Sequence, residues 1–157
     1  MGMKKLALAG IALSSLVGTA FAEEGAIHGG AHHHANHVAV FAGAVSAHDH
    51  AGAAVGLDVE RRFGRLLGVA VAAEGTQIEN EMGVLVIPAV VVHPWGGVKL
   101  LGGVGWEHAH GHDEIVMRAG GGYDVHVGTV SVGPSVAVDR AGGATAFVGG
   151  VAVGAGF

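Results

Sequence analysis

The 157-residue sequence predicts an all-β protein: a closed eight-stranded antiparallel up-and-down transmembrane β-barrel whose lumen is filled by side chains. Three observations support this fold class. The composition is rich in glycine and apolar residues, the chain divides into eight segments of similar length, and aliphatic residues alternate with glycine and charged residues along them. The length leaves room for one domain only.

The composition excludes most other fold classes. The chain holds 30 Gly, and each Gly in a helix costs about 1 kcal/mol relative to Ala, which argues against a helix-rich globule. Its mean hydropathy of +0.51 is too high for a disordered chain. Yet no run after residue 22 approaches the roughly 20 apolar residues of a membrane-spanning helix. Cys is absent, which excludes disulfides, thiolate chemistry and Cys-ligated metals.

Residues 1–22 are predicted to be a secretory signal peptide. Lys4 and Lys5 precede the apolar stretch 6–17, and a small-x-small cleavage site ends at Ala22. The alternative, a buried or membrane-spanning N-terminal helix, is disfavoured because the stretch is short and ends in that cleavage pattern. Cleavage would remove two Lys and no acid, leaving 135 residues with 6 Lys and Arg against 13 Asp and Glu, a formal charge of −7. This balance disfavours nucleic-acid binding, which needs a basic face.

After a flexible His-rich tail at 23–37, eight segments separated by turn-like clusters are predicted to form the barrel, 38–157. Strands of ~9–11 residues can cross a bilayer when tilted, and regular strand spacing is typical of a sandwich or barrel. The predicted strands are Val38–Ala47, Ala53–Phe63, Leu66–Gly75, Met82–His93, Val98–His108, Glu114–His126, Thr129–Arg140 and Ala144–Phe157.

The alternation separates two faces of opposite character. In the seventh strand Val130, Val132, Pro134, Val136 and Val138 share one face, and Ser, Gly, Ala and Asp take the other. A soluble barrel, such as a lipocalin-like ligand carrier, would bury its large apolar side chains and expose its charges. Here the second face is too small and too ionic for a dry core or a solvated exterior. The aliphatic face is therefore predicted to meet lipid, and the other to fill a narrow lumen.

Aromatic residues are predicted to mark both membrane interfaces, where amphipathic rings settle at headgroup level. A meander places Phe63, Trp95, Tyr123 and Phe157 at one rim and Trp106 and Phe147 at the other. Phe41 lies inside its strand and fits neither rim.

The C-terminal strand carries a more specific pattern. Val151, Val153, Ala155 and Phe157 place apolar residues at every second position and an aromatic residue at the end. With the signal peptide and eight alternating strands, the chain resembles the small eight-stranded outer-membrane barrels of the OmpA/OmpX-like class. The resemblance implies a location in the outer membrane of a Gram-negative bacterium, contact with lipid and lipopolysaccharide, and recognition of the terminal pattern by the barrel-assembly machinery. One departure is that Ala and Val replace many of the usual outward Leu and aromatic residues.

Charged residues of inward parity are predicted to form an ion-pair network that plugs the lumen, since an eight-stranded barrel encloses only enough space for its own side chains. The predicted members are Asp58, Glu60, Arg62, Glu74, Lys99, Glu107, Arg118, Asp124 and Asp139. Three bases cannot pair with six acids, so some acids are expected near the rims or bound to water or cations. A proton or ion relay is the alternative role.

The outer rim is predicted to be acidic and rich in His. Chain ends of an even-stranded barrel leave on the periplasmic side, so the longer loops after strands one, three, five and seven lie outside. His-x-His spacing suits Zn, Ni or Cu, because alternate residues of an extended chain project to one side. The candidate ligands are His48, Asp49, His50, His108, His110, His112 and Asp113. Alternatively, the loops use His as an ordinary polar residue. The His-rich tail is expected to bind metal weakly, and His93 and His126 to be interfacial polar residues.

Three functions remain open, with no catalytic residue assigned. The favoured one is a structural or surface-interaction barrel, expected to be a monomer and not an enzyme. The others are an envelope metal-binding or metal-sensing protein, and a lipid-modifying enzyme or narrow channel. A resemblance to lipid A deacylases would require a Ser two residues after a membrane-facing His. Two residues after His126 the chain has Gly128 instead. Ser46 and Ser131 have no evident His and acid in a triad-like arrangement.

Overall fold

A computed structural model describes residues 34–109 and 111–157. The predicted signal peptide and most of the predicted tail lie outside the described residues. The strands are β1 (Asn36–Ala47), β2 (His50–Phe63), β3 (Leu67–Ile78), β4 (Glu81–Val92), β5 (Val98–Ala109), β6 (His112–Tyr123), β7 (Val125–Val127), β8 (Val130–Ala141) and β9 (Ala144–Gly156). No helix in this part of the chain is long and apolar enough to cross a membrane.

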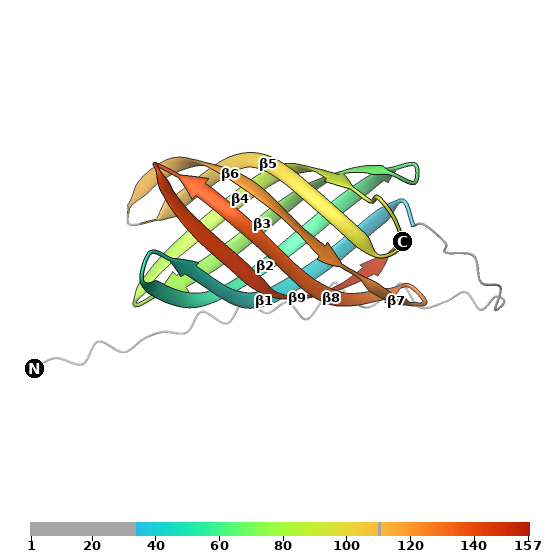
Figure 1. Cartoon of the computed structure of the whole chain (residues 1–157), viewed down its shortest axis with the longest axis horizontal. Coiled ribbons are helices and arrows are strands. Elements are labelled where there is room, and N and C mark those ends of the chain that lie inside the picture. The colour runs from blue at the N-terminus through green and yellow to red at the C-terminus, as the bar shows by residue number, and fades with distance from the viewer. Residues whose placement is uncertain (1–33, 110) are drawn as a thin grey trace, which may run out of the picture. The chain divides into compact units, whose positions relative to one another are not determined.

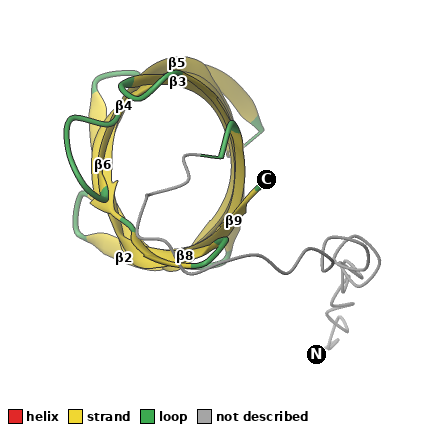
Figure 2. Cartoon of the chain, turned by 90° about the vertical axis from the view of Figure 1, so that its right-hand side faces the viewer, coloured by secondary structure: helices red, strands yellow, loops and turns green. Residues whose placement is uncertain are grey.

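The strands form a closed antiparallel barrel (Figures 1 and 2). Each strand pairs with its neighbour along the chain except β6 and β7, which both pair with β8. The first and last strands close the ring in a register that sets Val40 opposite Val153. Because β7 continues β6 after a break at Asp124, the described residues make eight strands when these two are counted as one. The predicted closed eight-stranded up-and-down barrel is confirmed.

Two prolines within strands sit where the hydrogen-bonded ladders are interrupted, because proline has no N–H to donate. The β6–β8 ladder ends at the pair Gly122–Ser135, and Pro134 of β8 lies next to this pair. The break between β6 and β7 lies opposite Pro134. Asp124, at the break, donates its backbone N–H to the Gly97 carbonyl at 2.8 Å instead. Pro88 of β4 lies in the corresponding gap of the β4–β5 ladder.

Most large aliphatic side chains of the strands face outward, and a set of charged side chains is buried inside the barrel. Val132, Val136, Val151 and Val153 are 43%, 61%, 50% and 51% exposed. Glu60, Glu74, Lys99, Arg118, Asp124 and Asp139 are all buried. The inverted polarity predicted from the alternation is therefore confirmed, since a soluble barrel would show the reverse arrangement.

The lumen holds two small apolar clusters beside its charges. One is formed by Val45, Ala54 and Val148, with Phe41 packed against it, and the other by Leu85, Ile87 and Val116. Phe41 fits neither aromatic rim because its ring points into the lumen. A Cβ at Gly43 would lie 2.7 Å from that ring, and one at Gly150 would lie 2.8 Å from it. Glycine at these two luminal positions therefore makes room for the one large aromatic side chain there.

The two rims differ in their connections. The terminal rim carries Asn36, Phe157 and the turns after β2, β4 and β7, and the hairpin rim carries the turns after β1, β3, β5 and β8. Each connection at the hairpin rim is two residues long, so the expectation of longer loops on this side is wrong. The His-rich and acidic segments extend the strands instead, because residues such as His50, Gln77 and Asp113 continue the ladders of their neighbours.

Candidate functional site in the barrel lumen

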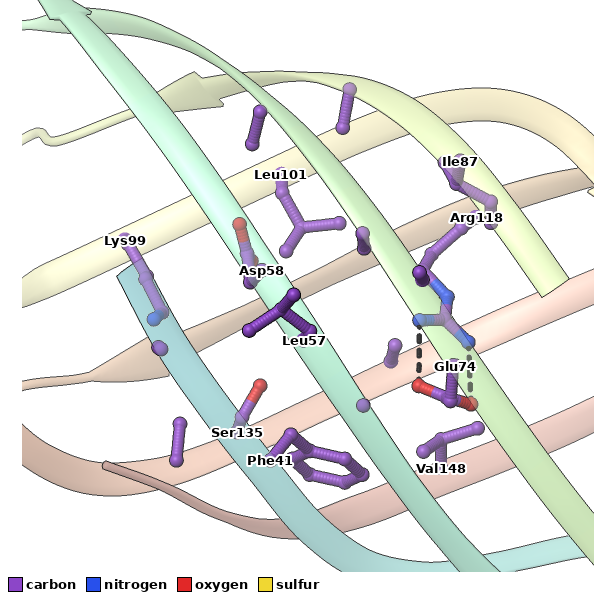
Figure 3. Close-up of a pocket in the computed structure, with 18 of the residues that line it drawn as sticks. Phe41, Leu57, Asp58, Glu74, Ile87, Lys99, Leu101, Arg118, Ser135 and Val148 are labelled. Carbon is purple, nitrogen blue, oxygen red and sulfur yellow. Dashed lines mark hydrogen bonds and ion pairs between the residues drawn. The ribbon is translucent and has the colours of Figure 1, made fainter. Parts of the chain in front are cut away.

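Three charged side chains from three strands meet in the lumen. Arg118 of β6 donates from Nε and Nη2 to the two carboxylate oxygens of Asp139 on β8, each at 2.6 Å. Its Nη1 and Nη2 donate to the Glu74 carboxylate of β3 at 3.0 and 3.1 Å (Figure 3). We call these three residues the Arg118 triad. Its members are all buried, and bidentate Arg–carboxylate geometry is among the strongest polar contacts a protein makes.

A second set of luminal contacts lies toward the terminal rim. Glu60 Oε1 accepts from Arg62 Nε at 3.0 Å and lies 2.6 Å from His93 Nε2. Lys99 Nζ lies 3.2 Å from Asp124 Oδ2. The side chain of His93 is 9% exposed, so the expectation that it is an interfacial polar residue is wrong, whereas His126 is exposed. Each luminal base predicted from the sequence thus faces at least one acid.

Asp58 occupies the space between these two sets. It lines a small cavity of about 60 Å³ together with Lys99, Glu74 and Arg118 (Figure 3). Among the buried side-chain polar atoms of the described residues, its Oδ1 alone has no hydrogen-bond partner. A cavity of this size has room for water, which is the usual partner of a buried polar atom left unpaired by the protein.

One contact in the lumen escaped the sequence analysis. His37 Nε2 of β1 lies 2.8 Å from Ser131 Oγ of β8, although β9 runs between these strands. Residue 37 was assigned to the tail, but β1 begins at Asn36 and His37 is buried inside the barrel. The only feature of the sequence that could have predicted this contact is the alternation along the strands, which places both side chains on the luminal face. Ser131 is 2% exposed, so this pair is a buried contact between the two strands.

A larger cavity, of about 410 Å³, lies between the Arg118 triad and the hairpin rim. We call it the vestibule. Its charged and polar lining comes from Glu74, Asp139, Glu107, Glu114, His48, His112, Thr76 and Thr145, and its apolar lining includes Val45, Ile78 and Leu85. Glu74 lines both this cavity and the one beside Asp58, so the Arg118 triad separates two hollow parts of the lumen.

The residues predicted as metal ligands fall into separate places. His50 Nδ1 lies 3.0 Å from Glu79 Oε1, and His108 Nδ1 lies 2.6 Å from Asp113 Oδ1. His108 stacks on Trp106 on the outer face, whereas His112 lines the vestibule. His108 and His112 do not project to one side as alternate residues of a single extended strand would. The reason is that β5 ends at Ala109 and β6 begins at His112 in the opposite direction.

The remaining candidates do not complete a cluster. His48 lines the vestibule, and Asp49 is exposed in the same two-residue turn. His110 lies outside the described residues. Among the residues that the structure does describe, no group of three or more His, Asp or Glu is arranged to hold a metal ion.

The sequence matches no family model and no curated protein. Its structure is similar to that of Neisserial surface protein A (NspA), with a TM-score of 0.59, 13% identity and coverage of 78% of this chain and 96% of that one. It is also similar to Ail, the attachment invasion locus protein of Yersinia pestis, solved with the heparin analogue sucrose octasulfate. That comparison gives a TM-score of 0.56, 13% identity and coverage of 78% and 97%.

A designed protein shares the architecture. A de novo transmembrane β-barrel matches with a TM-score of 0.56, 13% identity and coverage of 75% of this chain and 94% of that one. At such identities the similarity concerns the fold alone. The closed ring, the outward aliphatic face and these matches together give the chain the fold of the small eight-stranded outer-membrane β-barrels.

Proposed function

We propose that the protein is an integral outer-membrane β-barrel with a structural role and a lumen closed to solutes. The observation that carries this proposal is the inverted polarity, with exposed valines around the barrel and buried ion pairs inside it. An aliphatic exterior of this extent is stable only against lipid. The signal-peptide pattern at 1–22 adds an export route, and the terminal rim then faces the periplasm.

The Arg118 triad supports a plug rather than a relay or channel. Four hydrogen bonds fix the guanidinium between two carboxylates on different strands, and the triad separates the lumen's two cavities.

A structural role is favoured over a surface-ligand role by the hairpin rim. Its two-residue turns offer little surface above the membrane, and acids such as Asp49, Glu79, Glu81 and Asp113 lie there. Ail was solved with a polysulfated sugar analogue, and an acidic rim would repel a ligand of that charge. The partners we propose are membrane lipid and lipopolysaccharide, with the assembly machinery engaging Val151, Val153, Ala155 and Phe157 during insertion of a monomer.

Binding of Zn, Ni or Cu at the hairpin rim stays a prediction, with the candidate ligands His48, Asp49, His50, His108, His110, His112 and Asp113. Titration calorimetry of the purified barrel with Zn and Ni tests it. If the unchanged protein binds these metals no more tightly than a His110→Ala, His112→Ala variant does, the metal-binding prediction is wrong. A lipid-modifying activity is not proposed.

Membrane fractionation tests the main proposal. We expect the protein in the outer-membrane fraction, resistant to urea extraction, with the heat-modifiable gel mobility of a closed barrel. In planar bilayers the purified protein is expected to give no conductance steps. A soluble, urea-extractable protein would overturn the membrane assignment, and regular conductance steps would overturn the closed lumen.

A further inference from the structure

A groove crosses the outer face of the barrel over β2, β3, β4 and β5, and we call it the β2–β5 groove. Its volume is about 740 Å³, within the roughly 300–1,000 Å³ that small-molecule sites occupy. Exposed aliphatic side chains form its walls, namely Val59, Val69, Val71, Val90 and Val104. The hollow is open at Gly102, where a Cβ would meet no atom of the described residues beyond its chain neighbours within 4 Å.

The groove leads from the terminal rim into the part of the barrel that faces the bilayer interior. The ladders align Arg61 of β2, Val69 of β3, Val90 of β4 and Gly102 of β5 in one row. Arg61 lies close to the end of β2 at the terminal rim, whereas Gly102 lies near the middle of β5. A molecule in the groove would therefore have one end at headgroup level and the other in the hydrocarbon layer.

The rim end of the groove carries an exposed positive charge. Arg61 donates from Nη1 to Asn36 Oδ1 at 2.7 Å, and the planar fork of a guanidinium carries further N–H donors that suit the oxygens of a phosphate. Glu60 is the one acid among the described residues of the lining. It is buried, and its Oε1 is engaged by Arg62 and His93 in the lumen. The accessible charge of the groove therefore favours an anion.

An aliphatic groove with a guanidinium at its rim end is complementary to a molecule that has an alkyl chain and a phosphate. Beside the exposed valines of a transmembrane barrel the hydrocarbon is lipid, and long cationic side chains near an interface extend their charged ends toward the headgroups. We propose that the β2–β5 groove holds a glycerophospholipid, with an acyl chain along the valines and the phosphate against Arg61. This inference rests on the proposed function, because lipid lies beside the groove only if the barrel crosses a membrane.

Two lipids with the same acyl chains test this proposal on the protein purified in a non-ionic detergent. Dioleoylphosphatidylglycerol carries the phosphate and dioleoylglycerol lacks it, and native mass spectrometry measures how much of each stays bound to the barrel. We expect saturable binding of the phospholipid, about tenfold or more tighter than of dioleoylglycerol, because only the phospholipid bonds to the guanidinium. Equal binding of the two lipids would overturn the proposal, as would a second copy of the barrel bound in place of lipid.

A variant that fills the groove locates the bound lipid. Gly102→Leu is expected to weaken phospholipid binding by about tenfold, and the open space at this position lets the strand accept the side chain. Gly75→Leu is the matched control, because Gly75 has the outward parity of Val71 but lies outside the groove. A Cβ there would meet only the Val55 carbonyl oxygen, at 4.0 Å. Phospholipid binding that is the same in both variants would contradict the proposal.

A charge variant tests the rim end separately. Arg61→Gln is expected to bring phospholipid binding down to the level of dioleoylglycerol, whereas Arg140→Gln, at an exposed position of β8 outside the groove, leaves it unchanged. Heat-modifiable mobility verifies that each variant is folded, and Arg61→Gln provides the test if Gly102→Leu does not fold. Undiminished binding in the folded variants would overturn this inference while the barrel still fractionates with the outer membrane. A soluble protein would overturn the proposed function as well.

Discussion

His37 on β1 and Ser131 on β8 are in hydrogen-bonding contact across the intervening strand β9. The His37 side chain leaves β1, passes over Gly154 of β9 and reaches the Ser131 hydroxyl on β8, 2.8 Å from Nε2 to Oγ. A Cβ at Gly154 would lie 2.6 Å from two atoms of the imidazole. The absence of a side chain at position 154 thus allows a hydrogen bond that links β1 to β8 across β9, beside the seam where the barrel closes.

The first prediction concerns this seam. Gly154→Ala is expected to displace the imidazole and leave buried polar groups unpaired, at a cost of about 1–3 kcal/mol in the free energy of unfolding. Urea titration followed by heat-modifiable mobility measures it. Gly149→Ala is the matched control on β9, because its Cβ would meet only Val136 Cγ1 at 3.8 Å. Equal stability of the two variants would contradict the prediction.

The second prediction concerns the Arg118 triad. Arg118→Met leaves Glu74 and Asp139 buried without a counter-charge, and breaking a buried pair in this way costs about 3–5 kcal/mol. We expect a lower unfolding midpoint and less heat-modifiable barrel. Arg61→Met is the control, because Arg61 is exposed and donates a 2.7 Å hydrogen bond to Asn36 at the rim. An unchanged midpoint for Arg118→Met would show that the triad does not plug the lumen.

The third prediction tests which face meets lipid. Val136 lies near the middle of β8 and Val130 at its end, and both are exposed. An Arg on the lipid face costs about 2–4 kcal/mol at the bilayer midplane and about 0–1 kcal/mol near an interface. Val136→Arg should therefore destabilise the protein in vesicles much more than Val130→Arg. Equal effects would mean that β8 does not cross a bilayer.

The fourth prediction concerns Phe41. Phe41→Ala removes the ring that covers Gly43 and Gly150 and leaves a hollow beside Val45 and Val148. Such changes cost about 3–5 kcal/mol in a well-packed core, and the partial burial of Phe41 sets the expected loss at the lower end. Phe41→Leu should recover part of it. A Phe41→Ala barrel with the wild-type unfolding midpoint would show that the luminal cluster does not contribute to stability.

The fifth prediction concerns assembly in the cell. Phe157→Ala retains the backbone hydrogen bonds between residues 157 and 36, at 3.0 and 3.1 Å, and removes only the terminal ring. We expect less folded barrel in the outer membrane but unchanged refolding of the purified protein into detergent. Phe147→Ala, which removes an exposed aromatic residue from β9, should leave assembly unchanged. A loss in both assays would indicate a stability effect instead of a recognition effect.

The barrel's rims show where reasoning from the sequence failed. His50 and Gln77 lie outside the predicted strands because polar residues and glycine surround them, yet they belong to β2 and β3. A strand that rises above a membrane no longer needs apolar residues on its outer face, so its composition approaches that of a loop. The end of a strand is then decided by pairing with its neighbour, as the His108–Asp113 pair illustrates.

The sequence by itself determined which way the side chains of the strands point. Pleating turns successive residues to opposite faces whatever their neighbours, so Val136 had to face out if Asp139 faced in. Which side chains meet across the lumen was decided only by the tertiary structure. Arg118 and Glu74 are 44 positions apart in sequence, and His37 and Ser131 are 94 apart. Such contacts depend on the stagger between strands once the ring has closed, and the alternation along a single strand carries no information about that stagger.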